Sequence, residues 1–314
     1  MLYIAGTGRS GSTLLGSSLG QVDGFWSVGE LRHIWERGII GDWRCGCGLY
    51  FSQCPTWEKI LSGAFGGRQL DAGAVARSER RLTRVRHIPL VLLSQRRPEL
   101  IDDRVGDYRS YLDRLYRSVR SVTGADVIVD SSKSPTYGYL LRTIPSIDLS
   151  VVHLVRDPRA SAYSWTRRRE RNDAGRERRY MDVMGTGKSS VLWALWNTLT
   201  EVVLAGKPTR YIRLRYEDLM KDTRGSLTRI LEMVGSGDAR LPFLQSDVVE
   251  LQPSHSISGN PMRMQHGRVE VKPDVEWIER MNTRDRLLVA ALTGPVMGRY
   301  GYPLRRQGAL RHVS

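Results

Sequence analysis

The chain has 314 residues, enough for one large α/β domain or two small ones, and its 40% hydrophobic and 26% charged residues are ordinary for a soluble globular protein. No apolar run reaches the length of a membrane span, and Met1 leads into residues 2–5 without the pattern of a signal peptide, so we expect a cytoplasmic protein. The 48 Lys and Arg residues exceed the 33 Asp and Glu residues, and the formal net charge of +15 favours either an anionic partner or a surface of solvated arginines.

Short β-rich runs alternate with helical patterns, which predicts a parallel sheet covered by helices. The predicted strands are residues 2–5, 126–130, 149–155 and 209–214. Apolar residues at helical spacing predict helices over residues 108–122, 192–203 and 227–234. Two further segments are expected to form loops, a glycine- and cysteine-bearing one at residues 41–57 and a basic one at residues 167–190, which is either a flap over an anionic ligand or a solvated loop.

A glycine-rich turn follows the first strand and precedes a short apolar helix over residues 14–19. Such a turn is typical of a phosphate site, because glycines let the backbone approach the anion and the helix N-terminus presents free N–H groups. Hydroxyl groups and one guanidinium add further donors. The residues of this predicted site are Gly8, Arg9, Ser10, Gly11, Ser12 and Thr13.

The turn alone predicts a phosphate without choosing the ligand. The glycines at positions 6, 8 and 11 fit a dinucleotide fingerprint, and Glu30 follows Gly11 by 19 residues, near the place of a ribose-binding acid. A nucleoside-triphosphate loop would carry lysine where Ser12 stands. The later Gly187–Lys188–Ser189 string lacks the first glycine of that motif.

A second motif follows the strand over residues 149–155. Arg156 stands at the carboxyl end of that strand, where α/β sheets bind ligands, and Ser164 follows eight residues later on the next predicted helix. Together they could hold a second phosphate, for which a dinucleotide site has no obvious use. Alternatively, Arg156 pairs with Asp157 and stabilises the turn.

These motifs resemble those of the sulfotransferases that use 3′-phosphoadenosine-5′-phosphosulfate (PAPS), in particular the bacterial type. Residues 8–13 are similar to the loop for the 5′-phosphosulfate, and Arg156 with Ser164 is similar to the clamp for the 3′-phosphate. Tyr216 stands in a segment similar to the strand end whose tyrosine lies against the adenine. Residues 255–263 resemble the loop that closes over the donor, with Gly259, Asn260 and Arg263 as donor-binding residues.

The resemblance implies a single P-loop-like α/β domain over residues 1–314, with three layers and a central parallel sheet. Acceptor-side insertions are expected around residues 35–105 and a basic flap around residues 167–190. The implied reaction moves a sulfuryl group from PAPS to an acceptor hydroxyl by in-line displacement and releases 3′-phosphoadenosine-5′-phosphate (PAP), with no metal. The implied acceptor is a small molecule, a glycan or a peptide, and neither nucleic acid nor a membrane span is expected.

Three residues are implied to take part in catalysis. Residues 28–32 resemble the Gly-Glu-x-Arg segment of tyrosylprotein sulfotransferases, in which Glu30 would be the base; its alternative is a salt bridge with Arg32. Lys133 would stabilise the bridging oxygen of the donor, or else is a solvated loop lysine. Arg9 replaces the lysine of cytosolic small-molecule sulfotransferases and is similar to the carbohydrate and tyrosylprotein branches.

Histidines and cysteines leave alternatives open. His153 is expected to be a core residue, and His255 is a second candidate base. The odd count of three cysteines, all within residues 45–54, argues against a disulfide framework. Cys45, Cys47 and Cys54 could bind zinc with a fourth ligand such as His33, or brace a loop, or form an adventitious disulfide.

Two other functions remain as alternatives. A phosphoryl-transfer enzyme or nucleotide kinase with a degenerate loop would use Asp130 to hold magnesium. A polyanion-binding protein would use an arginine-rich helix over residues 167–179. No sequence motif identifies the acceptor. Four tryptophans either line an aromatic acceptor site or pack in the core: Trp26, Trp35, Trp43 and Trp57.

Overall fold

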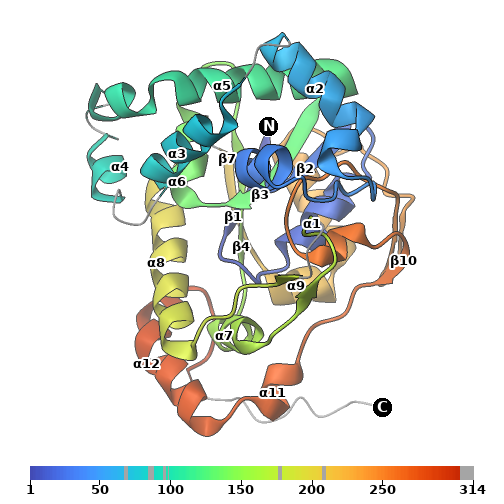
Figure 1. Cartoon of the computed structure of the whole chain (residues 1–314). Coiled ribbons are helices and arrows are strands. Elements are labelled where there is room, and N and C mark those ends of the chain that lie inside the picture. The colour runs from blue at the N-terminus through green and yellow to red at the C-terminus, as the bar shows by residue number, and fades with distance from the viewer. Residues whose placement is uncertain are drawn as a thin grey trace.

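A computed structural model of the chain describes residues 1–66, 70–83, 88–94, 97, 99–175, 179–206 and 210–304. Its centre is a sheet of five parallel strands in the order β2-β3-β1-β4-β7 (Figure 1). The strands are β1 (Leu2–Gly6), β2 (Phe25–Gly29), β3 (Val127–Lys133), β4 (Ser150–Val155) and β7 (Arg210–Arg215). This confirms the predicted α/β class with a central parallel sheet.

Helices cover both faces of the sheet (Figure 1). The helices are α1 (Ser12–Leu19), α2 (Pro55–Phe65), α3 (Ala72–Thr83), α4 (Ile88–Ser94), α5 (Glu99–Thr123), α6 (Pro135–Arg142), α7 (Pro158–Thr166), α8 (Thr186–Leu204), α9 (Tyr216–Lys221), α10 (Thr223–Met233), α11 (Glu276–Arg280) and α12 (Thr283–Arg299). Within the described ranges, no helix is both long and apolar enough to cross a membrane.

The alternation of side chains along β1 explains why two helical layers are needed. Leu2 and Ile4 join the core that contains α1, α9 and α10, whereas Tyr3 and Ala5 join the core that contains α2, α5 and α6. All four are fully buried. A strand that is apolar on both faces is stable only between two layers, as in parallel sheets generally.

The four predicted strands and three predicted helices are confirmed; Thr209 lies outside the described residues. The strand ends agree within one or two residues, except that β3 continues to Lys133, and the three helices begin four to nine residues before their predicted starts. Gly124 and Gly235 follow α5 and α10 in the left-handed region, with φ of 68° and 80°. The strand β2 was not predicted. A Cβ on Gly20 of the α1 C-cap would lie 2.8 Å from Ser27 Cβ, so the close approach of α1 favours a small residue at position 27 of this strand. That serine interrupts the apolar pattern.

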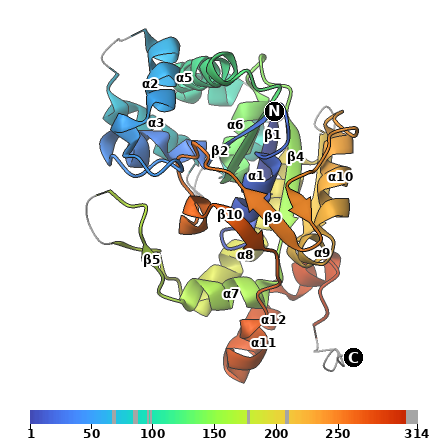
Figure 2. The same cartoon turned by 90° about the vertical axis from the view of Figure 1, so that its right-hand side faces the viewer.

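Smaller elements surround the carboxyl end of the sheet. A three-stranded antiparallel sheet of β8 (Leu244–Gln245), β9 (Val248–Leu251) and β10 (Gly267–Glu270) packs against α1 (Figure 2). Short helical turns are η1 (Leu31–His33), η2 (Ile34–Ile40), η3 (Phe51–Gln53) and η5 (Pro261–Met264).

The expected arginine-rich helix over residues 167–179 is wrong. The helix α7 ends at Thr166, and the chain then forms a two-stranded ribbon of β5 (Glu170–Arg171) and β6 (Arg179–Tyr180) (Figure 2). Residues 176–178 lie outside the described part. Stacking of the Arg171 guanidinium over Trp43, 4.7 Å from the ring centroid, stabilises the ribbon against the 41–57 loop.

Candidate active site

The glycine-rich turn, which is the predicted phosphate site, joins β1 to α1. Gly11 is the N-cap of α1 with φ of 90°, and no side chain of the described residues caps this helix end. The helix N–H groups therefore remain available to a ligand. Ser10 Oγ is buried and has no hydrogen-bond partner among the described residues.

The turn has its glycines where other residues would clash. A Cβ on Gly6 would lie 2.3 Å from the backbone oxygen of Leu154, and a Cβ on Gly11 would lie 2.7 Å from the ring of Tyr216. The second contact shows that the Tyr216 ring lies directly against the turn. Arg9 has φ of 67°, an uncommon backbone conformation for a residue other than glycine, which is often found at functional sites.

A cavity of about 580 Å³ opens beside this turn, at the carboxyl end of the parallel strands. Eight cationic and four anionic side chains are among its described lining residues, an excess that suits an anionic ligand. Most of the residues that the sequence assigns to the site line it together: Gly8, Arg9, Gly11, Ser12, Thr13, Glu30, Lys133, Arg156, Ser164, Tyr216, Gly259 and Asn260.

Glu30 and Lys133 form an ion pair at the ends of two neighbouring strands, β2 and β3. Their side chains are 13% and 14% exposed, and Lys133 Nζ also donates to the backbone oxygen of Ser131 at 2.9 Å. Lys133 is therefore not a solvated loop residue. Its φ of 67° is again an uncommon conformation at the site.

The charge of Glu30 is set by its neighbours. Burial acts to raise the pKa of Glu30, but Lys133 and Arg37, followed by Arg32, outweigh burial and lower that pKa below its usual value. Glu30 is therefore ionised at neutral pH. Burial lowers the pKa of the adjacent His33 well below its usual range, so His33 is neutral there.

Arg156, predicted with Ser164 to bind the second phosphate, lies against Tyr216, which is predicted to contact the adenine. The Arg156 guanidinium lies over the Tyr216 ring, 4.4 Å from its centroid, and Arg156 Nε is buried without a hydrogen-bond partner among the described residues. Arg156 Nη2 lies 3.2 Å from a carboxylate oxygen of Asp274 and donates to the backbone oxygen of that residue at 3.1 Å. A side-chain carboxylate thus lies against the guanidinium that is predicted to bind a phosphate.

The alternative pairing of Arg156 with Asp157 is not found. Asp157 instead accepts two hydrogen bonds from the Arg159 side chain, at 3.0 and 2.6 Å, and one from the Arg159 backbone N–H at 2.8 Å. Asp157 thereby caps α7 and leaves the Arg156 guanidinium on the cavity.

Arg9 connects the turn to the basic ribbon. Its guanidinium lies 4.8 Å from the centroid of the Trp165 ring and donates to Met181 Sδ at 3.1 Å and to the backbone oxygen of Asp182 at 3.2 Å. Burial, then the nearby Arg169 and Arg171, lower the pKa of Arg9 to about 10. Arg9 therefore stays charged at neutral pH.

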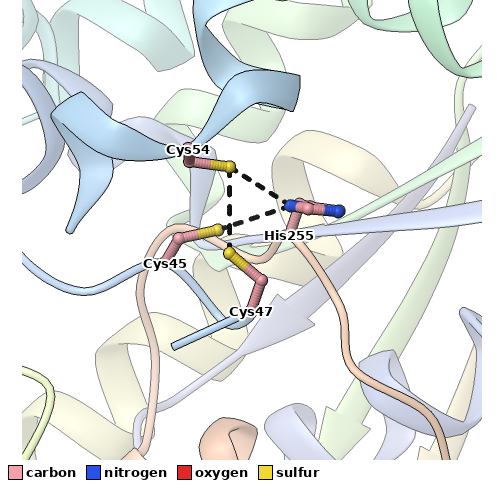
Figure 3. Close-up of side chains that lie close together, drawn as sticks. All are labelled: Cys45, Cys47, Cys54 and His255. Atoms are coloured by element: carbon pink, nitrogen blue, oxygen red, sulfur yellow. Dashed lines mark hydrogen bonds between the residues drawn. The ribbon is translucent and has the colours of Figure 1, made fainter. Parts of the chain in front are cut away.

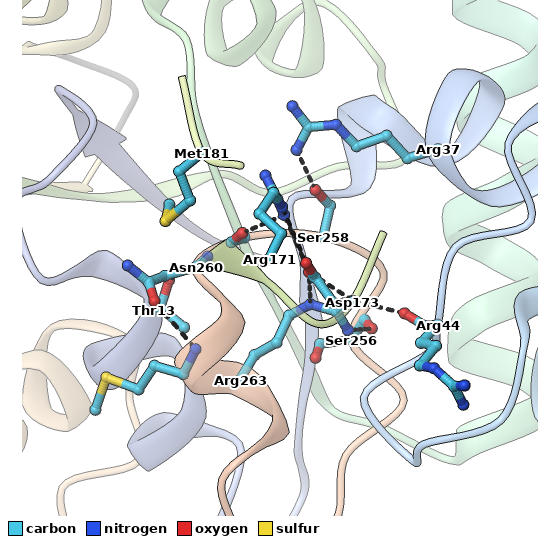
Figure 4. Close-up of polar contacts among 12 residues, drawn as sticks. Thr13, Arg37, Arg44, Arg171, Asp173, Met181, Ser256, Ser258, Asn260 and Arg263 are labelled. Atoms are coloured by element: carbon cyan, nitrogen blue, oxygen red, sulfur yellow. Dashed lines mark hydrogen bonds and ion pairs between the residues drawn. The ribbon is translucent and has the colours of Figure 1, made fainter. Parts of the chain in front are cut away.

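A buried carboxylate joins the ribbon to the donor-side segment at residues 254–264 (Figure 4). Asp173 pairs with Arg171 at 2.9 Å and with Arg263 at 3.1 Å. Arg171 also donates to the backbone oxygen of Gly259 at 2.9 Å, and the Asn260 backbone N–H donates to Thr13 Oγ1 at 3.3 Å. These contacts hold the segment over the glycine-rich turn.

Two predicted donor-binding residues lie outside the cavity. Ser10 is buried within the turn. Arg263 is 3% exposed, and its guanidinium pairs with Asp173. Its N–H groups also donate to the backbone oxygens of Ser256 and Arg44 at 2.7 and 2.5 Å. Arg263 therefore fixes the shape of the segment, and its own guanidinium does not reach the cavity.

The three histidines considered from the sequence lie in different parts of the structure. His153 is fully buried in the sheet, where its ring contacts Tyr211 Oη at 2.6 Å and Asn197 Oδ1 at 2.8 Å, as expected for a core residue. His33 Nε2 lies 3.5 Å from Glu30 Oε2, so His33 is not beside the cysteines. His255, the alternative base, lies beside them and does not line the cavity.

Two other expectations are also corrected. Asp130, the proposed magnesium ligand, is fully buried, and its two oxygens accept from Tyr116 Oη and from the Ser132 backbone N–H at 2.7 Å. It does not line the cavity. The tryptophans among the described lining residues are Trp165 and Trp196, whereas the four tryptophans considered for the acceptor site lie elsewhere: Trp26, Trp35, Trp43 and Trp57.

The fold is an α/β architecture with helices on both faces of a parallel sheet and a cavity rich in cationic side chains at the carboxyl edge of that sheet. Residues 2–238 match the model of a family described as the sulfotransferase family, and the chain belongs to that family. Family membership supports a transferase that moves sulfuryl groups. A search of curated proteins gave no match.

Two solved structures are similar over nearly the whole chain. The sulfotransferase domain from the curacin biosynthetic pathway shares 19% identity with a TM-score of 0.51, covering 97% of this chain and 98% of that domain. The sulfotransferase domain from the olefin synthase of Synechococcus PCC 7002 shares 20% identity with a TM-score of 0.49, covering 97% and 95%. At such identity the curacin-pathway domain shows a shared fold.

Proposed function

We propose that the chain transfers a sulfuryl group from PAPS to an acceptor hydroxyl and releases PAP. The observation that carries this proposal is that two groups suited to bind anions line one cavity, and Arg156 Nη1 also donates to the backbone oxygen of Arg9 in the turn at 3.1 Å. One is the uncapped N-terminus of α1, and the other is the guanidinium of Arg156. The Tyr216 ring contacts both, because it lies against Gly11 and under Arg156. Two such groups on one cavity suit a nucleotide that carries phosphates at the 5′ and 3′ positions of its ribose.

The 5′-phosphosulfate would bind at the glycine-rich turn. The N–H groups of α1 and the hydroxyls of Ser12 and Thr13 are donors of the kind that bind phosphate oxygens. Arg9 adds a positive charge that persists at neutral pH. Negative charge accumulates on the leaving phosphate during transfer, so these groups would stabilise the transition state as well as the bound donor.

The 3′-phosphate would bind Arg156 and Ser164. The buried Nε of Arg156 has an unused donor, and the guanidinium already faces the carboxylate of Asp274. A phosphate group would bind in place of that carboxylate. AMP lacks the 3′-phosphate and would leave this site without an anionic ligand.

Glu30 would take the acceptor proton as the new S–O bond forms and the bond from sulfur to the 5′-phosphate oxygen breaks. Lys133 pairs with Glu30 in the absence of substrate. If Lys133 turns toward the leaving phosphate oxygen, Glu30 loses its strongest partner and its pKa rises. The same movement would therefore supply charge stabilisation to the leaving group and basicity to Glu30.

Calorimetry with PAP and AMP tests the proposal without knowledge of the acceptor. A charge-assisted hydrogen bond is worth roughly 1.5–3 kcal/mol, so PAP should bind at least about tenfold more tightly than AMP. Arg156→Ala should remove that preference. Arg280→Ala is the matched control, because Arg280 is an exposed arginine on α11 with its side chain 71% accessible. Equal affinities of the wild-type protein for PAP and AMP would refute the proposed donor.

A further inference from the structure

Three cysteines and a histidine meet beside the sheet, outside the donor cavity (Figure 3). Cys45 and Cys47 lie in the tight turn that ends with the bridge between Arg44 and Tyr50, and Cys54 is the N-cap of α2. His255 comes from the donor-side segment at residues 254–264, about 200 positions later in the sequence. The fold therefore brings together two parts of the chain that are distant in sequence.

The ligand atoms have the spacing of a tetrahedral metal site. His255 Nδ1 lies 3.2 Å from Cys54 Sγ and 3.8 Å from Cys45 Sγ, and Cys47 Sγ lies 3.9 Å from Cys54 Sγ. All four ligand atoms lie within 4.8 Å of one another. Zinc–sulfur and zinc–nitrogen bonds of about 2.3 and 2.0 Å place tetrahedral ligands roughly 3.4–3.8 Å apart.

The surroundings of His255 orient its ring toward the sulfurs. His255 Nε2 lies 3.3 Å from Thr56 Oγ1. With its proton on Nε2, the ring would donate to Thr56 and leave the Nδ1 lone pair facing the cysteines, as metal binding requires. Trp26 stacks on the ring with centroids 5.7 Å apart and an interplanar angle of 8°. Trp57 Nε1 donates to the backbone oxygen of His255 at 2.7 Å. Such outer contacts are typical of metal-binding histidines.

The backbone around the cysteines is equally constrained. A Cβ on Gly46 would lie 2.6 Å from Ser256 Oγ and 2.7 Å from the backbone oxygen of Ser254, so only glycine fits between Cys45 and Cys47. The Gly46 N–H donates to the backbone oxygen of Ser256 at 2.9 Å. The Cys45 and Cys54 side chains are fully buried, which argues against a thiol that attacks a substrate.

We propose that Cys45, Cys47, Cys54 and His255 bind one structural zinc ion that fastens the 41–57 loop to the donor-side segment. Three cysteines and one histidine form a common structural zinc set, and with all four positions filled by the protein no position is left for substrate. Binding exchanges the thiol protons for the metal, so protons are released and no redox partner is needed. The proposal revises the expectation of no metal. It also replaces His33, the fourth ligand considered from the sequence, with His255.

The segment held by the zinc lies against the base proposed above. The Ile257 backbone N–H donates to the Val28 oxygen at 3.0 Å, and the Glu30 backbone N–H donates to the Ser258 oxygen at 3.1 Å. Loss of zinc is therefore expected to loosen the position of Glu30. Only this effect on turnover rests on the proposed function; the zinc site itself does not.

Metal analysis of the full chain, produced without a histidine tag in zinc-supplemented medium, tests the site directly. Inductively coupled plasma mass spectrometry should find one zinc per chain in the wild type and in His266→Ala, the control for an exposed histidine that directly precedes β10. Cys45→Ser, Cys54→Ser and His255→Ala should lose most of the zinc. His255→Cys should retain it, because four cysteines also form a structural zinc site.

Two further measurements keep the test decisive if a variant fails to fold. Cobalt added to metal-free wild-type protein should give thiolate charge-transfer absorption and the intense visible bands of tetrahedral cobalt. A zinc chelator should lower the melting temperature of the wild type by about 5 °C or more, and should leave that of Cys47→Ser unchanged. Wild-type protein without zinc would overturn the proposal. A single free thiol in protein denatured with chelator would show a disulfide in place of the metal site.

Discussion

Replacing Asp274 with asparagine is expected to tighten the binding of PAP and to leave the binding of AMP unchanged. The Asp274 carboxylate lies 3.2 Å from Arg156 Nη2 and competes with the 3′-phosphate for that guanidinium. Asparagine keeps the shape and the backbone contacts of the residue, including the donation of its N–H to Tyr216 Oη at 3.1 Å. The substitution therefore removes little besides the competing charge.

The size of the effect follows from the exposure of the pair. A hydrogen bond to a charged group is worth roughly 1.5–3 kcal/mol, and we reduce it to about 1 kcal/mol because solvent screens a partly exposed pair. The Asp274 side chain is 32% exposed. A gain of about 1 kcal/mol corresponds to roughly fivefold tighter binding of PAP.

Titration calorimetry of the wild type, Asp274→Asn, Arg156→Ala and the double variant measures this directly. The gain from Asp274→Asn should vanish when Arg156 is already alanine, because the two residues act through one contact. Unchanged PAP affinity in Asp274→Asn, or an equal gain for AMP, would show that the 3′-phosphate does not bind at Arg156.

Three further outcomes are expected. Glu30→Gln should lower kcat by about 10²–10⁴ without changing PAP binding, and a variant within a few-fold of wild type would exclude Glu30 as the base. Because the pKa of Glu30 is lowered in the substrate-free protein, wild-type kcat/KM, which reports free-enzyme groups, should fall only at a pH below the usual carboxylate range. Arg9→Ala should reduce kcat by about 10²–10³, and an effect on the KM for the donor alone would make Arg9 a binding residue only. Burial raises the pKa of Asp130 to about 6, so the folded state holds this proton more tightly than the unfolded state and loses stability as the pH rises from 4 to 6. The melting temperature of Asp130→Asn should therefore fall less than that of the wild type between pH 4 and 6. Identical pH profiles of the two melting temperatures would contradict the raised pKa of Asp130.

The sequence predicts those parts of the fold and site that are local in the chain. The first strand, the glycine-rich turn and α1 form one continuous segment, so their pattern of apolar residues and glycines is sufficient. The Arg156 motif is also a strand end followed by a turn and a helix. Because parallel strands present their carboxyl ends at one edge, these separate motifs were expected to meet there.

Contacts between distant segments could not be predicted in this way. Nothing near Cys54 in the sequence points to His255, and the nearer His33 was the natural candidate for a fourth ligand. The pairing of Asp274 with Arg156 depends on how the chain returns after β10. Its motif predicts that Arg263 binds PAPS, but its guanidinium instead forms an ion pair with the buried Asp173 of the ribbon. Each of these contacts is set by tertiary packing.

Transfer of label from ³⁵S-labelled PAPS is the most direct test of the central claim. The purified chain is incubated with labelled PAPS and a pooled metabolite extract, without added magnesium, and the products are separated and identified by mass spectrometry. The account predicts a labelled organic sulfate formed together with an equal amount of PAP. Absence of label in any acceptor, combined with magnesium-dependent transfer of the γ-phosphoryl group of ATP in a parallel reaction, would contradict it.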